Sequence, residues 1–456
     1  MPSGCRPVDE QGLGVRLRPA PDVAPVGHWQ PADRGSQQTG RFLAIRASGT
    51  AHQEQEPIGL STATVSTFTW LDHRDEDQER VREALAAFDQ PGIVDPLGFG
   101  AVRDAFSDLL FPGLSTVQTR ARYFLFVPWT YQRLEREGVP ASRGLERARA
   151  LEIATIEALR RGSDDEGVIG RHSRAGTRQL PSFIYWGGLG RWGIRAFAGS
   201  RQEYIAGLDR RRQRAQHSAA HEPLWPGLPA EPNGIFEETT LSLTAAEAEF
   251  LRDRAVAATR GSYLEGLLRD GHRGLDGNTP WSHPLALEAP AAIREQLHHA
   301  RLFAYAVQGA ELLYNVVLST MLEEDGAAPL AVDYDERFAR WCEEVEAREQ
   351  EYARWDREQF WSVVATANPR AVRARGFIDW WLDQAATDPR AVRGSAEARR
   401  RLRSREAQIK GARAKLANRR ARERFPSAQG GALMLFRWPQ SRRIIADIHE
   451  GLEDRA

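Results

Sequence analysis

The sequence predicts a mainly helical protein with more than one domain. A chain of 456 residues is longer than one compact core usually holds. Hydrophobic residues make up 41% of it, and 13 Trp and 18 Phe supply side chains for well-packed cores. Apolar residues recur at helical spacing over most of the chain, whereas the alternating patterns typical of strands are short. We therefore expect helical domains with a few short strands.

The chain begins with a stretch that is unlike the rest. Residues 1–64 are rich in Gly, Pro, Gln and Ser and lack periodicity, which predicts a disordered extension. The alternating residues 66–71 predict a short strand, and 75–88 predict an amphipathic helix. These elements would open an N-terminal, mostly helical domain over 65–235.

Four more helices are expected in that domain. They span 101–110, about 115–137 with a kink at Pro128, 145–161, and a stretch that begins at Pro181. A glycine-rich turn follows the last one, so 167–198 is compatible with a winged-helix-like unit. The turn contains "GLGRWG" (188–193), which matches Gly-x-Gly-x-x-Gly. A dinucleotide site needs a strand before this motif and a helix after it, and the order here is the reverse, which indicates a helix-ending turn.

A second helical domain is expected over 236–389. Two capping boxes predict helix starts at Thr244-x-x-Glu247 and Ser262-x-x-Glu265. A long helix is predicted over 290–324, and its apolar run is interrupted by Gln308, Glu311 and Asn315. A carboxylate at mid-membrane costs about 2.5–3.5 kcal/mol, so we interpret this run as a buried helix and expect no membrane partner.

The remaining composition points to the cytoplasm. The chain has two cysteines, Cys5 and Cys342, far apart, which favours a reducing compartment without a disulfide framework. No basic-then-apolar signal pattern opens the sequence. The histidines show no metal-ligand spacing, and Glu295-x-x-His298 is only half of a di-iron pattern, so no metal or cofactor is predicted.

The last part of the chain, 390–456, is predicted to hold a basic helix, a strand and a final helix. Residues 390–424 contain fourteen Arg or Lys against three Glu, although the whole chain has 62 basic and 62 acidic residues. The helix is expected over 395–424 and the strand over 432–438, where it would pair with 66–71. Leu402, Ile409 and Leu416 recur every seven residues and give the helix one narrow apolar seam.

A helix with such a seam docks by one edge and presents its guanidiniums to something anionic. Phosphates fit, because Arg binds them bidentately and the contact releases counterions. The predicted nucleic-acid-binding residues are Arg399, Arg400, Arg403, Arg413, Arg419 and Arg420. An acidic surface of this chain or of a partner protein would satisfy the same charges, and the sequence leaves this alternative open.

A set of three aspartates offers a separate hypothesis, that of a metal-dependent nuclease. Asp104 and Asp108 are one helical turn apart, and with Asp95 they have the composition of a nuclease metal site. Arg120 and Arg122 follow on the next predicted helix, however. Ion pairs between the two helices are the simpler interpretation.

Four stretches carry a resemblance to a known family. They are "TWLDHRDEDQERVREAL", "GFGAVRDAFSDLLFPGLSTVQTRARYFLFVPWTY", "LPSFIYWGGLGRWGI" and "FRWPQSRRIIADIHEGL". Over about 66–456 the chain resembles the bacterial family called domain of unknown function 6361. The resemblance implies a place in genomic islands that defend against phage, beside helicases and nucleases, and it implies no catalytic residue.

Together these observations suggest a non-catalytic nucleic-acid-binding or adaptor subunit of a bacterial anti-phage defence system. DNA or RNA would be one partner, and a helicase or nuclease subunit another. The alternatives are a structural protein that docks on such a subunit, or a magnesium-dependent nuclease.

Overall fold

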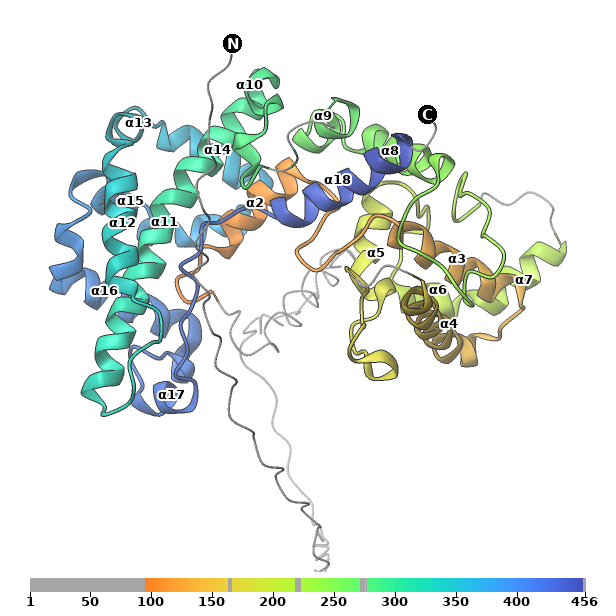
Figure 1. The fold of residues 1–456 in the computed structure, drawn as a ribbon, viewed down its shortest axis with the longest axis horizontal. Coiled ribbons are helices and arrows are strands. Elements are labelled where there is room, and N and C mark those ends of the chain that lie inside the picture. Colours follow the sequence, from red (N-terminus) through yellow and green to blue (C-terminus); the bar gives the residue numbers. More distant parts are fainter. Residues whose placement is uncertain (1–94, 163–165, 218–222, 271–274, 276, 454–456) are drawn as a thin grey trace, which may run out of the picture. The chain divides into compact units, whose positions relative to one another are not determined.

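The computed structural model confirms the mainly helical prediction. It describes residues 95–162, 166–217, 223–270, 275 and 277–453, all within one compact unit, residues 69–456. Within these ranges the chain forms 17 α-helices and no strand (Figure 1). The winged-helix-like unit predicted near 167–198 is not seen, because the described part of that segment contains only helices and turns. The predictions for 1–64, 66–71 and 75–88 lie outside the described residues.

The helices are joined by connections that range from a single residue, between α6 and α7, to residues 218–244, between α7 and α8. The first ten are α2 (Gly100–Leu110), α3 (Tyr123–Arg136), α4 (Ala141–Arg161), α5 (Pro181–Arg191), α6 (Arg201–Ala206), α7 (Leu208–His217), α8 (Ala245–Ala258), α9 (Tyr263–Asp270), α10 (Leu285–Glu288) and α11 (Ala291–Glu324). The other seven are α12 (Tyr334–Glu346), α13 (Glu349–Ala353), α14 (Arg357–Ala367), α15 (Arg375–Thr387), α16 (Ala396–Lys410), α17 (Arg419–Arg424) and α18 (Trp438–Glu453).

Several helices lie where their apolar spacing predicted them. Those expected over 101–110, 145–161 and 290–324 appear as α2, α4 and α11. α5 begins at Pro181, and Gly193 takes a positive φ of 66° just after its end, so the glycine motif is a helix-ending turn as predicted.

The helix expected from 115 begins later, at Tyr123. Residues 115–122 form turns, because their polar groups bond to distant parts of the chain and not to a helical turn of their own. The Tyr185 hydroxyl, for example, accepts a hydrogen bond from the Thr119 backbone N–H at 2.8 Å. α3 then continues through Pro128 to Arg136.

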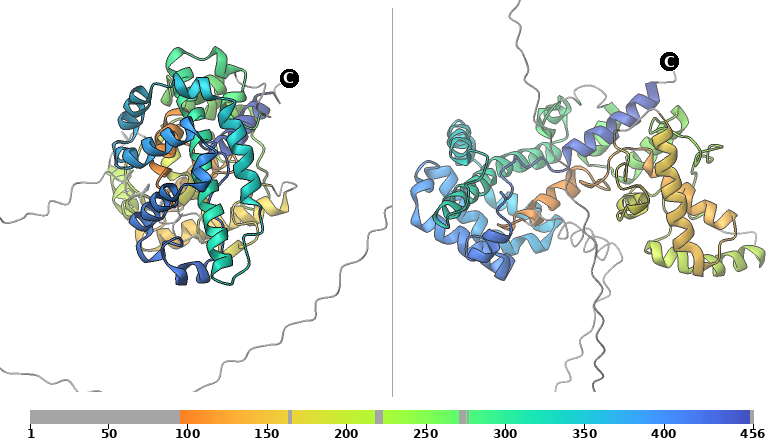
Figure 2. Two further views of the ribbon diagram at one scale, coloured as in Figure 1. Left: turned by 90° about the vertical axis from the view of Figure 1, so that its left-hand side faces the viewer. Right: turned by 60° about the horizontal axis from the view of Figure 1, so that its bottom comes forward.

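The ion pairs expected between Arg120 or Arg122 and the α2 aspartates are absent. Arg120 Nε lies 2.9 Å from Asp447 Oδ1 in α18, and Arg122 Nη2 lies 2.9 Å from Glu247 Oε1 in α8. All four side chains are buried. α18 packs on α8, as Figure 2 also shows, and this packing supplies both carboxylates. The two arginines thus tie the 115–122 turns to α18 and to α8, which local sequence spacing does not reveal.

α11 lies among several other helices and packs against α2, α12, α15 and α16. It is long and apolar enough to cross a membrane by length and composition, but most of it is buried inside the protein. The polar residues that interrupt the apolar run of this helix bind another part of the chain. Asn315 exchanges hydrogen bonds of 3.0 and 2.8 Å with the backbone of Gln429, and Glu311 Oε2 accepts the Gly431 N–H at 2.6 Å.

These polar residues bind the linking segment, residues 425–437, which joins α17 to α18. The strand predicted over 432–438 is wrong, since 432–437 form no strand and Trp438 begins α18. The segment satisfies part of its backbone with side chains of α11, and Phe436 and Arg437 both take positive φ values, 49° and 67°, which ends any extended run.

Candidate nucleic-acid interface

The predicted basic helix is in fact two helices joined by a short turn. α16 ends at Lys410, and Gly411 follows with a positive φ of 54°, a conformation that favours glycine and does not continue a helix. The 3₁₀ turn η5 (Gly411–Arg413) follows, and α17 begins at Arg419. We call residues 396–424 the basic module. The predicted continuous helix over 395–424 is wrong because Gly411 ends it.

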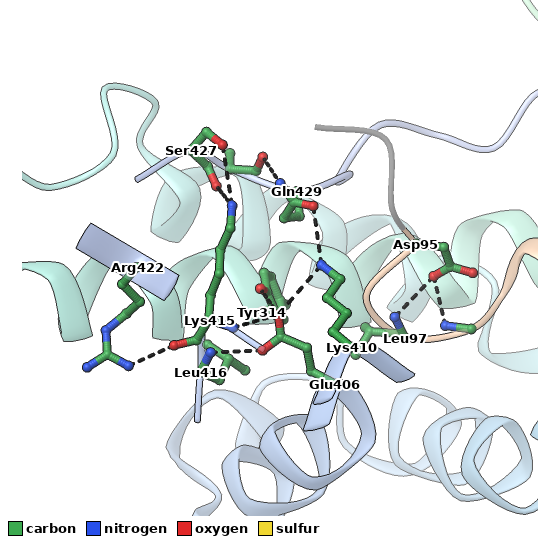
Figure 3. Close-up of polar contacts among 12 residues, drawn as sticks. Asp95, Leu97, Tyr314, Glu406, Lys410, Lys415, Leu416, Arg422, Ser427 and Gln429 are labelled. Atoms are coloured by element: carbon green, nitrogen blue, oxygen red, sulfur yellow. Dashed lines mark hydrogen bonds and ion pairs between the residues drawn. The ribbon is translucent and has the colours of Figure 1, made fainter. Parts of the chain in front are cut away.

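A buried carboxylate holds the two halves of the basic module together (Figure 3). Glu406 of α16 is fully buried and accepts hydrogen bonds from the backbone N–H groups of Lys415 at 3.0 Å and Leu416 at 2.8 Å. Its Oε1 also accepts the Tyr314 hydroxyl of α11 at 2.6 Å. One side chain therefore anchors α16, the turn and the core helix.

The chain's two lysines both lie in this cluster. Lys410 Nζ is 3.6 Å from Glu406 Oε1, and Lys415 Nζ donates to the Ser427 carbonyl at 2.8 Å. Burial lowers the pKa of both ammonium groups, that of Lys415 to about 8. Only Lys410 of the two pairs with Glu406, whereas the Lys415 ammonium binds the carbonyl and the hydroxyl of Ser427. The cluster thus contains two ammonium groups and one carboxylate.

Arg422 fixes α17 to the same frame. Its side chain is buried, with Nη2 2.7 Å from Asp325 Oδ2 and Nη1 donating to the Lys415 carbonyl at 2.7 Å. The segment around Lys415 is thus bound from α16 by Glu406 and from α17 by Arg422. The outward faces of the two helices are consequently held in a fixed relation.

The six arginines predicted to bind nucleic acid are all exposed. They are Arg399, Arg400 and Arg403 on α16, Arg413 on η5, and Arg419 and Arg420 on α17. Whether they bind nucleic acid stays a prediction. They differ in how much of their charge this chain already neutralises.

Two of the six have an acidic neighbour. Arg419 Nε is 2.9 Å from Glu423 Oε1 and 3.5 Å from Asp325 Oδ1, whereas Arg400 reaches Glu397 only at 4.0 Å. The other four have no acidic partner among the residues that the structure describes; they are Arg399, Arg403, Arg413 and Arg420.

Arg424 is an exposed arginine of this surface that the sequence did not single out. Arg424 lies one helical turn after Arg420 on α17, is exposed, and places its guanidinium carbon 5.3 Å from the centre of the Phe425 ring. Its spacing from Arg420 was the available signal.

The seven-residue seam is only partly buried. Leu402 and Leu416 are fully buried, but Ile409 is 38% exposed. Because the helix ends at Lys410, Ile409 and Leu416 no longer share one helical face.

The three aspartates of the nuclease hypothesis have separate partners. Asp95 accepts the backbone N–H groups of Leu97, Gly98 and Gly100 at 3.0, 2.8 and 2.6 Å. Asp104 pairs with Arg103 at 3.0 Å and Asp108 with Arg437 at 2.6 Å. Over the described ranges, no group of three or more His, Cys, Asp or Glu has the arrangement of a metal site.

The fold and this surface define a mainly helical protein with an exposed arginine-rich module. The chain belongs to the family described as "Family of unknown function (DUF6361)", whose model matches residues 65–451. Comparison with curated proteins and with solved structures gave no match.

Proposed function

We propose that this protein is a non-catalytic nucleic-acid-binding or adaptor subunit. The exposed arginines of the basic module would hold the phosphate backbone without reading the base sequence. One observation carries the proposal: Arg399, Arg403, Arg413 and Arg420 have no acidic partner within the described residues. The helices that bear them are held in a fixed relation by Glu406 and Arg422, so the four charges keep their positions.

The electrostatics of the frame support an anionic ligand. The basic module carries four exposed guanidiniums without an acidic partner in the described chain, and its interior contains the ammonium groups of Lys410 and Lys415 with one carboxylate, Glu406. Phosphate groups bound at this surface would be attracted by the exposed guanidiniums and by the buried ammonium groups. Each neutralised phosphate would also release a counterion. With four such contacts to duplex DNA, the logarithm of the association constant should fall with the logarithm of salt concentration at a slope of about −3.6.

An electrophoretic shift with labelled DNA or RNA, repeated at rising salt, tests the proposal. The test variant changes Arg399, Arg403, Arg413 and Arg420 to Glu. Its matched control changes to Glu four other exposed arginines that also lack an acidic partner in the described part of the chain: Arg143, Arg210, Arg214 and Arg370. Both variants change the net charge equally. We expect binding to be lost in the first and kept in the second; no binding by the wild type at low salt refutes the proposal.

A second candidate is a structural protein that docks on a helicase or nuclease. The exposed Ile409, 38% accessible beside the arginines, favours it, because an apolar side chain gains from a protein surface. Co-purification that survives nuclease treatment, and that Ile409→Glu abolishes, supports this candidate. Loss of the complex on nuclease treatment supports the first.

We also infer a cytoplasmic role in a bacterial anti-phage defence system, on the strength of the resemblance described above. Phage plating on bacteria that carry the protein with its neighbouring genes tests this context. Equal plating on bacteria with and without the protein contradicts it.

A further inference from the structure

An exposed aromatic ring, that of Phe425, directly follows the basic module. Seven large hydrophobic side chains are exposed among the described residues, and Phe425 is the only aromatic one, at 45% accessibility. It directly follows α17, the helix that carries Arg420 and Arg424. The other large aromatic residues of the described part are buried or half-buried. Phe425 therefore differs from them in being exposed, and it does so beside the arginines.

The backbone that carries the ring is held by hydrogen bonds, and one arginine lies against the ring itself. The Phe425 backbone N–H donates to the Ala421 carbonyl at 3.1 Å, and the Ser427 N–H donates to the Phe425 carbonyl at 2.8 Å. The Arg424 guanidinium carbon lies 5.3 Å from the ring centre. A guanidinium that lies over an exposed ring stacks on it, and a further flat group, such as a nucleic-acid base, can add to this stack.

We propose that the basic module prefers single-stranded nucleic acid, with an unpaired base stacked on Phe425 and the adjoining phosphates on Arg420 and Arg424. This inference rests on the proposed function. In a duplex the faces of the bases are stacked on one another and cannot reach a protein ring, whereas an unpaired base offers its face to any aromatic side chain. A surface of arginines without an aromatic ring would bind the phosphates of single-stranded and duplex nucleic acid alike. The exposed ring adds affinity only for the single-stranded form.

The test compares a single-stranded oligonucleotide with a duplex of the same length, at one salt concentration, by fluorescence anisotropy. We expect Phe425→Ala to weaken single-strand binding by about 5- to 150-fold, the range for one stacked base, and to leave duplex binding unchanged. Phe425→Trp should keep the single-strand affinity, because it preserves a stacking face. Leu287→Ala, at a hydrophobic residue that is 81% exposed, is the matched control and should have no effect.

The outcomes separate this inference from the proposed function. If the wild type binds both forms equally and Phe425→Ala changes neither, the single-strand inference is refuted while the proposed function stands. An equal loss for both forms also refutes it, because the ring then supports the fold of the module. Absence of all binding refutes the proposed function, and this inference with it. Thermal unfolding of Phe425→Ala should match that of the wild type, since the side chain lies at the surface and outside the core.

Discussion

Changing Glu406 to Gln is the most direct perturbation of the frame that carries the basic module. The substitution keeps the size of the side chain and removes its charge. One amide oxygen can still accept from the Tyr314 hydroxyl and the Lys415 N–H, as Oε1 does now. The new amide nitrogen replaces Oε2, however, and would face the Leu416 N–H across 2.8 Å. Two donors would then meet in a buried site.

The size of the effect follows from these contacts. A buried N–H left without an acceptor costs about 1–3 kcal/mol, and hydrogen bonds to a charged group are worth about 1.5–3 kcal/mol each. Lys410, 3.6 Å away, would also lose its carboxylate partner. We expect a local destabilisation of about 2–4 kcal/mol.

Hydrogen exchange of the Leu416 backbone amide measures this directly. If exchange proceeds through local opening of the basic module, 2–4 kcal/mol corresponds to an acceleration of about 30- to 700-fold. Glu423→Gln is the matched control: it breaks only an exposed pair with Arg419 and should cost less than about 1 kcal/mol. Unchanged Leu416 exchange in the Glu406 variant would refute the role given to this carboxylate.

Two further perturbations test the rest of the fold. Asp447→Asn leaves the buried Arg120 without its counterion, so we expect a loss of about 3–5 kcal/mol in a urea unfolding curve; a loss below 1 kcal/mol would contradict the assigned pairing. Burial raises the pKa of Glu311 from 4.5 to about 7. Because the native state then holds this proton more tightly than the unfolded chain, stability should fall as pH rises from about 4.5 to 7, and Glu311→Gln should remove that slope. Identical pH dependence in the wild type and the Glu311 variant would show that this carboxyl does not titrate as described.

Local patterns in the sequence were sufficient where a helix depends on its own residues. Apolar spacing placed α2, α4 and α11, because burial of one face follows a period of 3.6 residues. The capping box of α8 formed as predicted: the Thr244 hydroxyl accepts the Glu247 N–H at 3.3 Å, and the Glu247 carboxylate accepts the Thr244 N–H at 3.0 Å.

Local patterns failed where a partner comes from far along the chain. Arg120 pairs with a residue 327 positions later, so nothing in its surroundings indicated Asp447. The aspartates of α2 looked like natural partners because they were near in sequence. Tertiary packing of α18 instead satisfied the arginine by direct contact in a buried site, where an ion pair needs close geometry.

The basic module shows both sides of this division. The sequence by itself determined that an excess of arginine lies near the carboxyl end and that Leu402 and Leu416 are buried. Only the tertiary structure decided that Gly411 divides the helix, that Glu406 holds the two parts together, and which guanidiniums remain without an acidic partner in the described chain. Composition sets how much charge a segment carries, but the positions of distant carboxylates decide how much of it stays available at the surface.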